Sequence, residues 1–385
     1  MRITRMKTIC LSRLHEPEQQ WFTTQSRTIK ADCCLVVIET DEGITGVGEA
    51  TAYGIPNLVR ERVEAISLLM VGRDPTDSSI APHPNGLSRT YDAAVAGVDQ
   101  ALWDIRGKLA GKPVCELLAE KPLHRIRLYA SSGCRWDWRT PNPERQLIEE
   151  ALEYFQHGFT AYKFRIGTHW AWDGVTVDRF LGVVRELHQE LKGRMELMVE
   201  GNSRLTEEQA LAIGKELDRL GGFNWFEEPV PREDLDAYVR LSEAIETPIS
   251  AGEAYSTLEQ FLPFITRRAY DITQQDVGLC GISEGLRIAL LGNEQGIRTV
   301  PHSWHNLLMG VANAHLVAAL PDPWLLELCM IQGPLQWQIL RENPVKDGYL
   351  EIPRKAGLGV ELADDLEERF PYIEGHYAIQ VDRHS

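Results

Sequence analysis

The sequence has no basic stretch and no apolar run long enough to span a bilayer. Its 385 residues carry 40 Lys and Arg against 56 Asp and Glu, a formal net charge of −16. A chain of this charge, without a cluster of cations, is not expected to bind nucleic acid or an anionic membrane surface. The most apolar stretch, Leu307–Leu320, contains Asn313 and His315 and is too short for a membrane-spanning helix. An anionic ligand would therefore depend on a few local cations.

Cysteine shows no organised spacing. The seven cysteines form neither a CxxC motif nor paired separations; they are Cys10, Cys33, Cys34, Cys115, Cys134, Cys280 and Cys329. A disulfide framework is therefore not indicated. We expect buried, reduced thiols in a cytoplasmic protein. The N-terminus agrees with this expectation, because it enters strand-like sequence without the apolar core of a secretion signal.

A chain of this length has room for two or three domains, and its pattern changes near residue 125. Residues 1–125 predict an α+β domain. Its strands are expected at Ile3–Leu11, Cys33–Thr40 and Ile44–Glu49, and its helices at Asn57–Val71 and Tyr91–Ala110. Two polar loops, His15–Arg27 and Ala50–Pro56, interrupt this domain.

Residues 126–349 repeat strand-like and helix-like segments. The strand-like runs end near Ser131, Arg165, Glu200, Glu228, Glu253, Asp276, His302 and Glu327. Eight strands at this spacing predict a TIM-type barrel, which carries its chemistry at the C-terminal ends of its strands. The polar tail, residues 350–385, is expected to be irregular and to pack back on the first domain. The two loops of that domain are expected to close over the barrel mouth and exclude water.

Three consecutive expected strands end in a carboxylate. The segment Asn224–Val230 reads Asn-Trp-Phe-Glu-Glu-Pro-Val, an apolar strand that reaches Glu227 and is ended by Pro229, which lacks the N–H that a ladder needs. Glu200 lies 27 residues upstream and Glu253 lies 26 residues downstream. Alone, each acid could face water and cap the next helix. Because parallel strands point the same way, the three carboxylates converge, and such hard oxygen ligands suit Mg²⁺.

Two further patterns place cations and a base at the same end of the barrel. Lys163 and Arg165 are two residues apart in the second barrel strand, so both face one side of it. Asp276 and His302 end adjacent strands, where the carboxylate would fix the imidazole tautomer and raise its basicity. A lone histidine would more often be structural, but a neighbouring aspartate favours catalysis.

Together these motifs resemble the enolase superfamily, and within it the mandelate racemase-like subgroup. The resemblance covers nearly the whole chain and rests on the Asp92–Leu118 helix, Val199–Asn202, Phe226–Pro229, Ala251–Glu253, Asp276 with Gly281 and Gly285, and His302. It implies an α/β fold in which an N-terminal α+β capping domain covers a (β/α)7β TIM-type barrel.

The resemblance also implies roles for individual residues. The Mg²⁺ ligands would be Glu200, Glu227 and Glu253. Lys163 sits where the KxK motif of the family begins, and Asp276 with His302 matches its catalytic dyad. Glu327 matches an acid that hydrogen-bonds the substrate carboxylate. Glu228 is expected to orient its neighbour or to pair with a cation.

The chain departs from the family pattern at two positions. The family usually has Asp where this chain has Glu200, and the extra methylene moves the carboxylate by roughly 1.5 Å. The second lysine of the KxK motif is Arg165 here. In the racemase that lysine is one of two bases on opposite faces of the substrate, whereas arginine stays protonated and is a poor base. His302 is therefore the strongest candidate for proton transfer.

The chemistry of the subgroup is removal of the proton α to a carboxylate, with Mg²⁺ stabilising the enediolate. With a single base, His302, and with Lys163 and Arg165 as electrostatic partners, we expect an acid-sugar dehydratase that converts an aldonate or aldarate to a 2-keto-3-deoxy acid. Two alternatives stay open. One is a racemase or epimerase with Lys163 or Tyr162 as the second base. The other is a non-catalytic metal-binding or regulatory relative.

Substrate selection is expected to involve loops at the barrel mouth. The residues concerned are Trp21, Tyr53, Arg135, Trp136, Asn202 and Trp304. Nothing in the sequence indicates which acid sugar is used. We expect a small-molecule substrate and a homo-oligomer.

Overall fold

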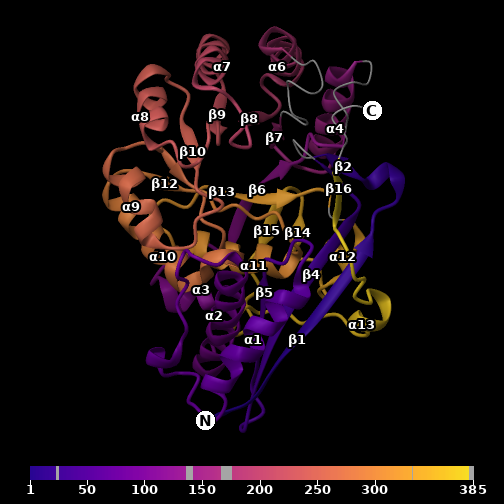
Figure 1. Cartoon of the computed structure of the whole chain (residues 1–385), viewed down its shortest axis with the longest axis vertical. Helices are drawn as coiled ribbons and strands as arrows, with labels where there is room; N and C mark the ends of the chain where they lie inside the picture. Colours follow the sequence, from indigo (N-terminus) through magenta and orange to yellow (C-terminus); the bar gives the residue numbers. More distant parts are fainter. Residues whose placement is uncertain (23–25, 136–141, 166–175, 332, 381–385) are drawn as a thin grey trace.

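The computed structural model describes residues 1–22, 26–135, 142–165, 176–331 and 333–380. A capping part at the bottom of Figure 1 carries an α/β part above it. The capping part contains an antiparallel sheet in the order β1-β4-β5, formed by β1 (Ile3–Leu14), β4 (Lys30–Thr40) and β5 (Thr45–Ala50). The helices that pack on this sheet are α1 (Pro56–Met70) and α2 (Arg89–Ala110), followed by the short α3 (Val114–Leu118).

The close approach of α2 to β5 depends on glycine. A Cβ on Gly48 would lie 2.2 Å from the carbonyl oxygen of Gly97, and one on Gly46 would lie 2.1 Å from that of Ala101. Alternation along β5 places both glycines against the helix. The helix backbone therefore packs directly on the strand.

Eight parallel strands alternate with helices in the second part. The strands are β6 (Arg125–Ser131), β7 (Ala161–Arg165), β8 (Glu196–Glu200), β9 (Phe223–Glu227), β10 (Ile249–Ala251), β11 (Ile272–Thr273), β12 (Arg298–Thr299) and β13 (Leu325–Cys329). The described helices between them are α4 (Pro143–Gln156), α6 (Val177–Leu191), α7 (Glu207–Leu220), α8 (Leu235–Ala244), α9 (Leu258–Thr266), α10 (Val277–Glu294) and α11 (Leu307–Ala318). Strands β6 to β12 pair in chain order and β13 pairs with β6, whereas among the described residues no ladder joins β12 to β13. The predicted fold class is confirmed.

Alternation along the strands separates the barrel interior into an apolar and a polar layer. The apolar layer contains Tyr129, Ala161, Met198, Trp225 and Leu325, with Ile272 and Val300. Two residues further along the same strands come Ser131, Lys163, Glu200, Glu227 and Glu327, all buried. Because side chains repeat every two residues along a strand, both layers face the interior. The apolar layer thus closes the barrel floor beneath a polar layer at the mouth.

Several predicted strand ends shift by one to three residues. β9 ends at Glu227 rather than Glu228, and β10, β11 and β12 end before Glu253, Asp276 and His302. Gly252 at φ 114° breaks the ladder after β10, and Asp276 caps the helix after β11. Pro301 precedes His302 and lacks an N–H. β13 instead continues past Glu327 to Cys329.

The capping part holds the helices that follow Asp276 and His302. Figure 1 shows α10 and α11 above the capping part, where α10 packs on α2 and α11 packs on β5 and α3. Glu49 in β5 accepts hydrogen bonds from the Asn306 side chain (2.7 Å) and the Met309 N–H (3.0 Å), at the start of α11. Asp99 in α2 accepts from the Ser283 N–H (2.9 Å), beside the kink of α10 at Gly281. A carboxylate that accepts hydrogen bonds from the unpaired N–H groups of a helix stabilises that helix. The capping part therefore anchors both helices.

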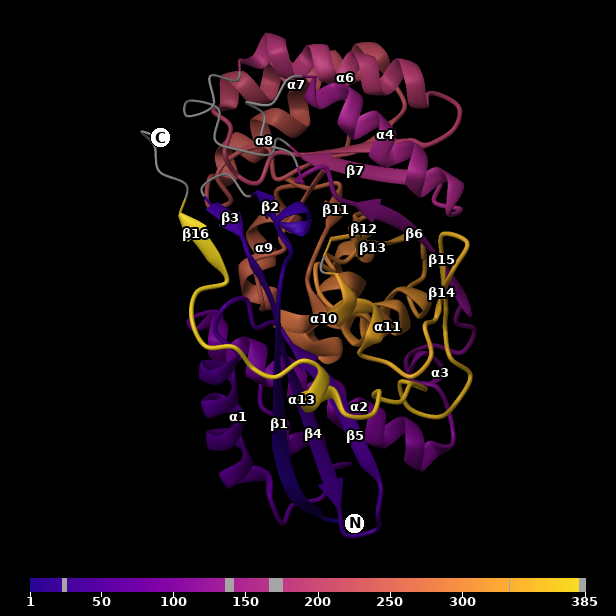
Figure 2. The same ribbon diagram turned by 90° about the vertical axis from the view of Figure 1, so that its right-hand side faces the viewer.

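Two segments expected to be irregular contain regular structure. The loop after β1 forms the short helix η1 (Pro17–Gln19) and the strands β2 (Trp21–Phe22) and β3 (Ser26–Thr28). The tail contributes β16 (Ala378–Gln380), which pairs with β3 and lies beside it in Figure 2. Earlier in the tail, β15 (Tyr349–Glu351) pairs with β14 (Val345–Lys346) and with β6. Strands of three residues in a polar tail leave no periodic pattern in the sequence, so these pairings could not be predicted from it. Within the described residues, no helix combines the length and apolar composition needed to cross a bilayer.

Candidate active site

Three carboxylates converge at the mouth of the barrel. Glu200 is the last residue of β8, Glu227 is the last of β9, and Glu253 follows β10 by two residues. One oxygen from each lies within 4.8 Å of the others. Glu200 and Glu227 are almost fully buried, whereas 24% of the Glu253 side chain is exposed. The arrangement leaves one open side toward the mouth, where a ligand could complete the shell of a cation.

The three acids fit a divalent cation chemically. Carboxylate oxygens are the ligands that Mg²⁺ prefers. Burial and then the neighbouring charge of Glu227 raise the pKa of Glu200 well above its usual range. A divalent cation among the three oxygens would relieve this repulsion. Asn202 donates its N–H to Glu200 (2.7 Å), and the side chains of Trp225 (2.9 Å) and Gln274 (2.6 Å) both donate to Glu227.

Lys163 lies at the centre of the polar layer. Its Nζ contacts Glu227, lies 3.3 Å from Glu200 Oε2 and lies 3.0 Å from Glu327 Oε1. Burial would lower the pKa of Lys163, but Glu227 and Glu327 raise it well above its usual range. A lysine held protonated by three acids is a source of positive charge rather than a proton acceptor.

His302 and Asp276 form a buried pair. His302 Nδ1 lies 2.9 Å from Asp276 Oδ2, and its Nε2 lies 3.3 Å from Glu253 Oε2. Burial opposes the charge on His302, yet Glu253, Glu327 and the hydrogen bond with Asp276 raise its pKa to about 9. Burial likewise opposes ionisation of Asp276, but His305 and His302 hold its pKa well below its usual range. Asp276 is therefore the acceptor, and Nε2 of His302 is the atom that faces the carboxylates.

Arg165 is buried beside the pair, on the same face of β7 as Lys163. Its guanidinium carbon lies 4.1 Å from the centre of the Trp304 ring, a cation–π arrangement. Among the residues that the structure describes, its Nε has no hydrogen-bond partner. Tyr162, between the two cations, faces outward: its hydroxyl donates to Glu150 (2.9 Å) among residues that pack under the helices. This position excludes Tyr162 as a second base.

Two further predicted acids are also buried. Glu327 accepts a hydrogen bond from the Ser303 N–H (2.7 Å). Burial opposes its ionisation, but Lys163 and His302 lower its pKa, so here it accepts hydrogen bonds. Glu228, at φ 37°, points away from the cluster formed by Glu200, Glu227 and Glu253, called the three-acid cluster below. It accepts hydrogen bonds from Ser203 (2.6 Å) and Arg232 (3.1 Å).

The capping loops reach the barrel mouth. Trp21 in β2 meets Trp304 edge to face, with ring centres 5.6 Å apart. Tyr53 donates its hydroxyl to the Trp304 carbonyl (2.6 Å). Arg135 lies 3.8 Å from Glu150, outside the three-acid cluster. Trp136 lies outside the described residues. The two capping loops thus contact the segment that carries His302.

Three side chains that contact the site were not predicted from the sequence. His305 shares Asp276 with His302, Gln274 binds Glu227, and the Tyr129 ring lies 5.6 Å from Lys163 Nζ. His305 follows His302 by three residues in Pro-His-Ser-Trp-His, and this spacing was the available signal. Gln274 follows β11 and Tyr129 lies in β6, so only the barrel brings them to Glu227 and Lys163.

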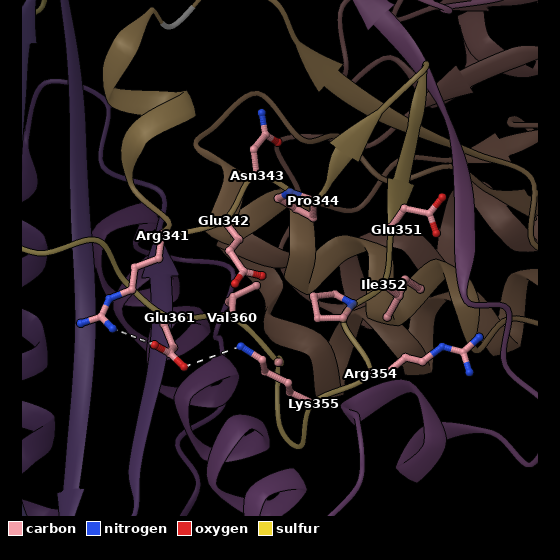
Figure 3. Close-up of a pocket in the computed structure, with 12 residues that line it drawn as sticks. Arg341, Glu342, Asn343, Pro344, Glu351, Ile352, Arg354, Lys355, Val360 and Glu361 are labelled. Carbon is pink, nitrogen blue, oxygen red and sulfur yellow. Dashed lines mark hydrogen bonds and ion pairs between the residues drawn. The ribbon is translucent and has the colours of Figure 1, made fainter.

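A separate cleft of about 420 Å³ lies between the β14–β15 hairpin and the following segment (Figure 3). Three of its charged side chains pair with one another. Glu361 contacts Arg341 at 3.0 Å and Lys355 at 3.8 Å. None of the predicted site residues lines this cleft. The predicted acids and cations lie at the barrel mouth instead.

Two family models match the two parts of the chain. Residues 4–119 match the mandelate racemase / muconate lactonizing enzyme N-terminal domain, and residues 146–366 match the enolase C-terminal domain-like family. The chain is 30% identical to an arabinonate dehydratase of Saccharolobus solfataricus, covering 86% of this chain and 89% of that protein. It is 32% identical to a D-galactarolactone cycloisomerase of Agrobacterium fabrum, covering 96% and 99%.

A solved structure agrees over the same length. An enolase superfamily member from Polaromonas sp. JS666 superposes with a TM-score of 0.85 at 29% identity, covering 98% of this chain and 99% of that one. The matches span both the capping part and the barrel, including every strand that carries an acid of the site. The chain belongs to the enolase superfamily, in the mandelate racemase / muconate lactonizing enzyme subgroup.

Proposed function

We propose that this enolase-superfamily enzyme is an acid-sugar dehydratase. One observation carries the proposal: the buried His302–Asp276 pair faces the three-acid cluster, while Arg165 occupies the position of the family's second base. A single base that removes the α-proton favours elimination over inversion of configuration. The dehydratases among the relatives support the same class of reaction.

In this mechanism Glu200, Glu227 and Glu253 hold Mg²⁺, which when bound supplies positive charge beside the substrate carboxylate. His302, whose raised pKa of about 9 makes it a strong base once Nε2 has released its own proton, takes the proton from the α-carbon with Nε2, while Asp276 retains the hydrogen bond from Nδ1. The electron pair of the broken C–H bond forms the double bond between the α- and β-carbons as the β-carbon–oxygen bond breaks. His302 returns the proton to the departing hydroxyl, which leaves as water. The enol product then becomes a 2-keto-3-deoxy acid.

The cations of β7 act on the developing negative charge. Lys163 and Arg165 lie on one face of the strand, next to the acids, and both stay protonated. Preorganised charge of this kind in a water-poor site usually supplies the largest part of catalysis. Neither residue is suited to remove a proton in this mechanism. A racemase is therefore disfavoured.

A cycloisomerase is the second candidate. The chain matches the D-galactarolactone cycloisomerase over 96% of its length. Removal of the same α-proton by His302, followed by loss of a ring oxygen in place of a hydroxyl, would need no additional base. The two reactions differ in their leaving group.

The test is a screen of aldonic acids, aldaric acids and their lactones with Mg²⁺. Formation of a 2-keto-3-deoxy acid without ring opening supports the dehydratase. Conversion of lactones alone would identify the cycloisomerase. In D₂O, a dehydratase should give no substrate of inverted configuration, whereas a racemase would give it rapidly. Absence of any turnover, before or after EDTA, would indicate a non-catalytic relative.

A further inference from the structure

Asp276 is shared between two imidazoles. Its Oδ2 lies 2.9 Å from Nδ1 of His302 and 2.9 Å from Nε2 of His305. Its Oδ1 accepts the N–H of Gly278 at 2.8 Å. All three side chains are buried. Because Asp276 is ionised and can only accept, both ring nitrogens that face it must carry protons.

His305 is held in place by the capping loop, residues 50–56. The ring of Tyr53 stacks on the His305 ring with centres 4.9 Å apart and planes 29° apart. The Thr51 hydroxyl oxygen lies 3.2 Å from His305 Nε2. The two imidazoles cross at 86°, with centres 6.0 Å apart. The orientation of His305 therefore depends on two residues far from it in sequence.

We propose that His305 is a positioning residue for the base. Its Nε2–H holds the Asp276 carboxylate in the orientation in which that carboxylate accepts the Nδ1–H of His302. With the Gly278 N–H on the other oxygen, the carboxylate cannot rotate away without losing a hydrogen bond. Without His305, one of the two side-chain restraints on Oδ2 is lost. His302 would then sample ring orientations in which Nε2 does not face the α-carbon.

This inference rests on the proposed function, in which His302 is the base. His305 does not touch the reacting atoms, so its loss should act on kcat and leave substrate and metal binding nearly intact. A residue that only fills space would show no preference for a hydrogen-bond donor at the position of Nε2. The comparison between a donor and an apolar replacement therefore separates positioning from packing.

The test compares H305Q with H305L. The glutamine amide places an N–H close to the position of imidazole Nε2, whereas leucine keeps bulk without a donor. H305L should lower kcat by about 10–100-fold, with KM and the Mg²⁺ dissociation constant nearly unchanged. H305Q should recover most of the activity. His188, on α6 and stacked on Phe223, provides the matched controls H188Q and H188L, which should keep wild-type kcat.

A second measurement does not require turnover. In protein labelled with ¹⁵N-histidine, the Nδ1–H resonance of His302 is assigned by its loss in H302N. This Nδ1–H resonance should shift in H305L and return toward its wild-type position in H305Q. If no acid sugar is turned over, the proposed function fails, but this resonance still decides whether the carboxylate is shared. An unchanged resonance in H305L, or equal losses of kcat in both variants, would overturn the inference.

Discussion

At the scale of single residues, the site depends on side chains whose charge is set by their neighbours. Asp276 is held ionised by two imidazoles, and Lys163 is held protonated by acids. These pKa shifts keep a negative and a positive group charged within one site. Perturbed pKa values of this kind are concentrated at catalytic sites. His302 is the member of the Asp276–His302–His305 cluster whose second ring nitrogen, Nε2, faces the three-acid cluster, 3.3 Å from Glu253 Oε2.

The first prediction concerns the base. H302N removes the proton acceptor while keeping a similar shape, so kcat should fall by at least about 10²–10⁴-fold. In D276N, kcat should fall less than in H302N, because the substitution misorients the imidazole without removing it. Both variants should still bind Mg²⁺, measured by calorimetry. Full dehydration by H302N would contradict the one-base mechanism.

The second prediction concerns Arg165, whose guanidinium stacks on Trp304. R165K restores the family's usual lysine but loses the planar stacking group. We expect dehydration to slow modestly, and slow exchange of the substrate α-proton for deuterium to become measurable in D₂O. The exchange is followed by NMR of recovered substrate. Rapid epimerisation by the unmodified protein would show instead that a second base already exists.

At the scale of elements, buried hydrogen bonds join the barrel to segments distant in sequence. His315 in α11 accepts the N–H of Cys115 at Nδ1 (3.1 Å) and faces the carbonyl of Leu358 through Nε2 (3.1 Å). Only a neutral imidazole with its proton on Nε2 satisfies both partners. The side chain therefore connects α3, α11 and the tail.

The third prediction concerns acid stability. Burial lowers the pKa of His315 to about 4, whereas the unfolded value is 6.5. As the pH falls, His315 therefore takes up a proton in the unfolded chain before it does so in the folded chain. The stabilisation that is present above pH 6.5 is lost as the pH falls toward 4. H315Q cannot titrate, so between pH 7.5 and 5 its unfolding free energy should fall by about 2 kcal/mol less than that of the wild type. Denaturant unfolding at both pH values measures this difference, and equal losses would rule out the assignment.

At the scale of the whole molecule, the three-acid cluster is a repulsive feature that metal binding would convert into a stabilising one. The capping part is joined to the barrel at α10 and α11, because Glu49 and Asp99 anchor these helices, which follow the proposed catalytic pair. A ligand that binds only the folded state stabilises both parts together. The expected homo-oligomer stays a prediction.

The fourth prediction follows from this linkage. Mg²⁺ at about 100 times its dissociation constant should raise the unfolding free energy by about 2.7 kcal/mol, and EDTA should reverse the effect and abolish turnover. E253Q should weaken the response strongly, because it removes a charged ligand. E361Q, a matched change in the separate cleft, should respond like the wild type. A metal response that survives E253Q and is lost in E361Q would place the ion elsewhere.

Much of the site could be predicted from short stretches of sequence. The acids of β8 and β9, the cations of β7 and the histidine after β12 stand at strand ends, and strand periodicity together with breakers such as Pro229 is readable from neighbouring residues. Parallel strands in a barrel present their ends on one side, so convergence of these groups followed from the repeat.

The tertiary structure alone decided the contacts between distant segments. It placed His305 against Asp276 under Tyr53 and paired β16 with β3. Such contacts join residues tens to hundreds of positions apart, and they depend on how the capping part packs on the barrel rather than on local propensity. A local pattern fixes which face of a strand a residue occupies. Packing decides which partner it meets there, because the entropy of closing long loops is offset only when the whole fold forms.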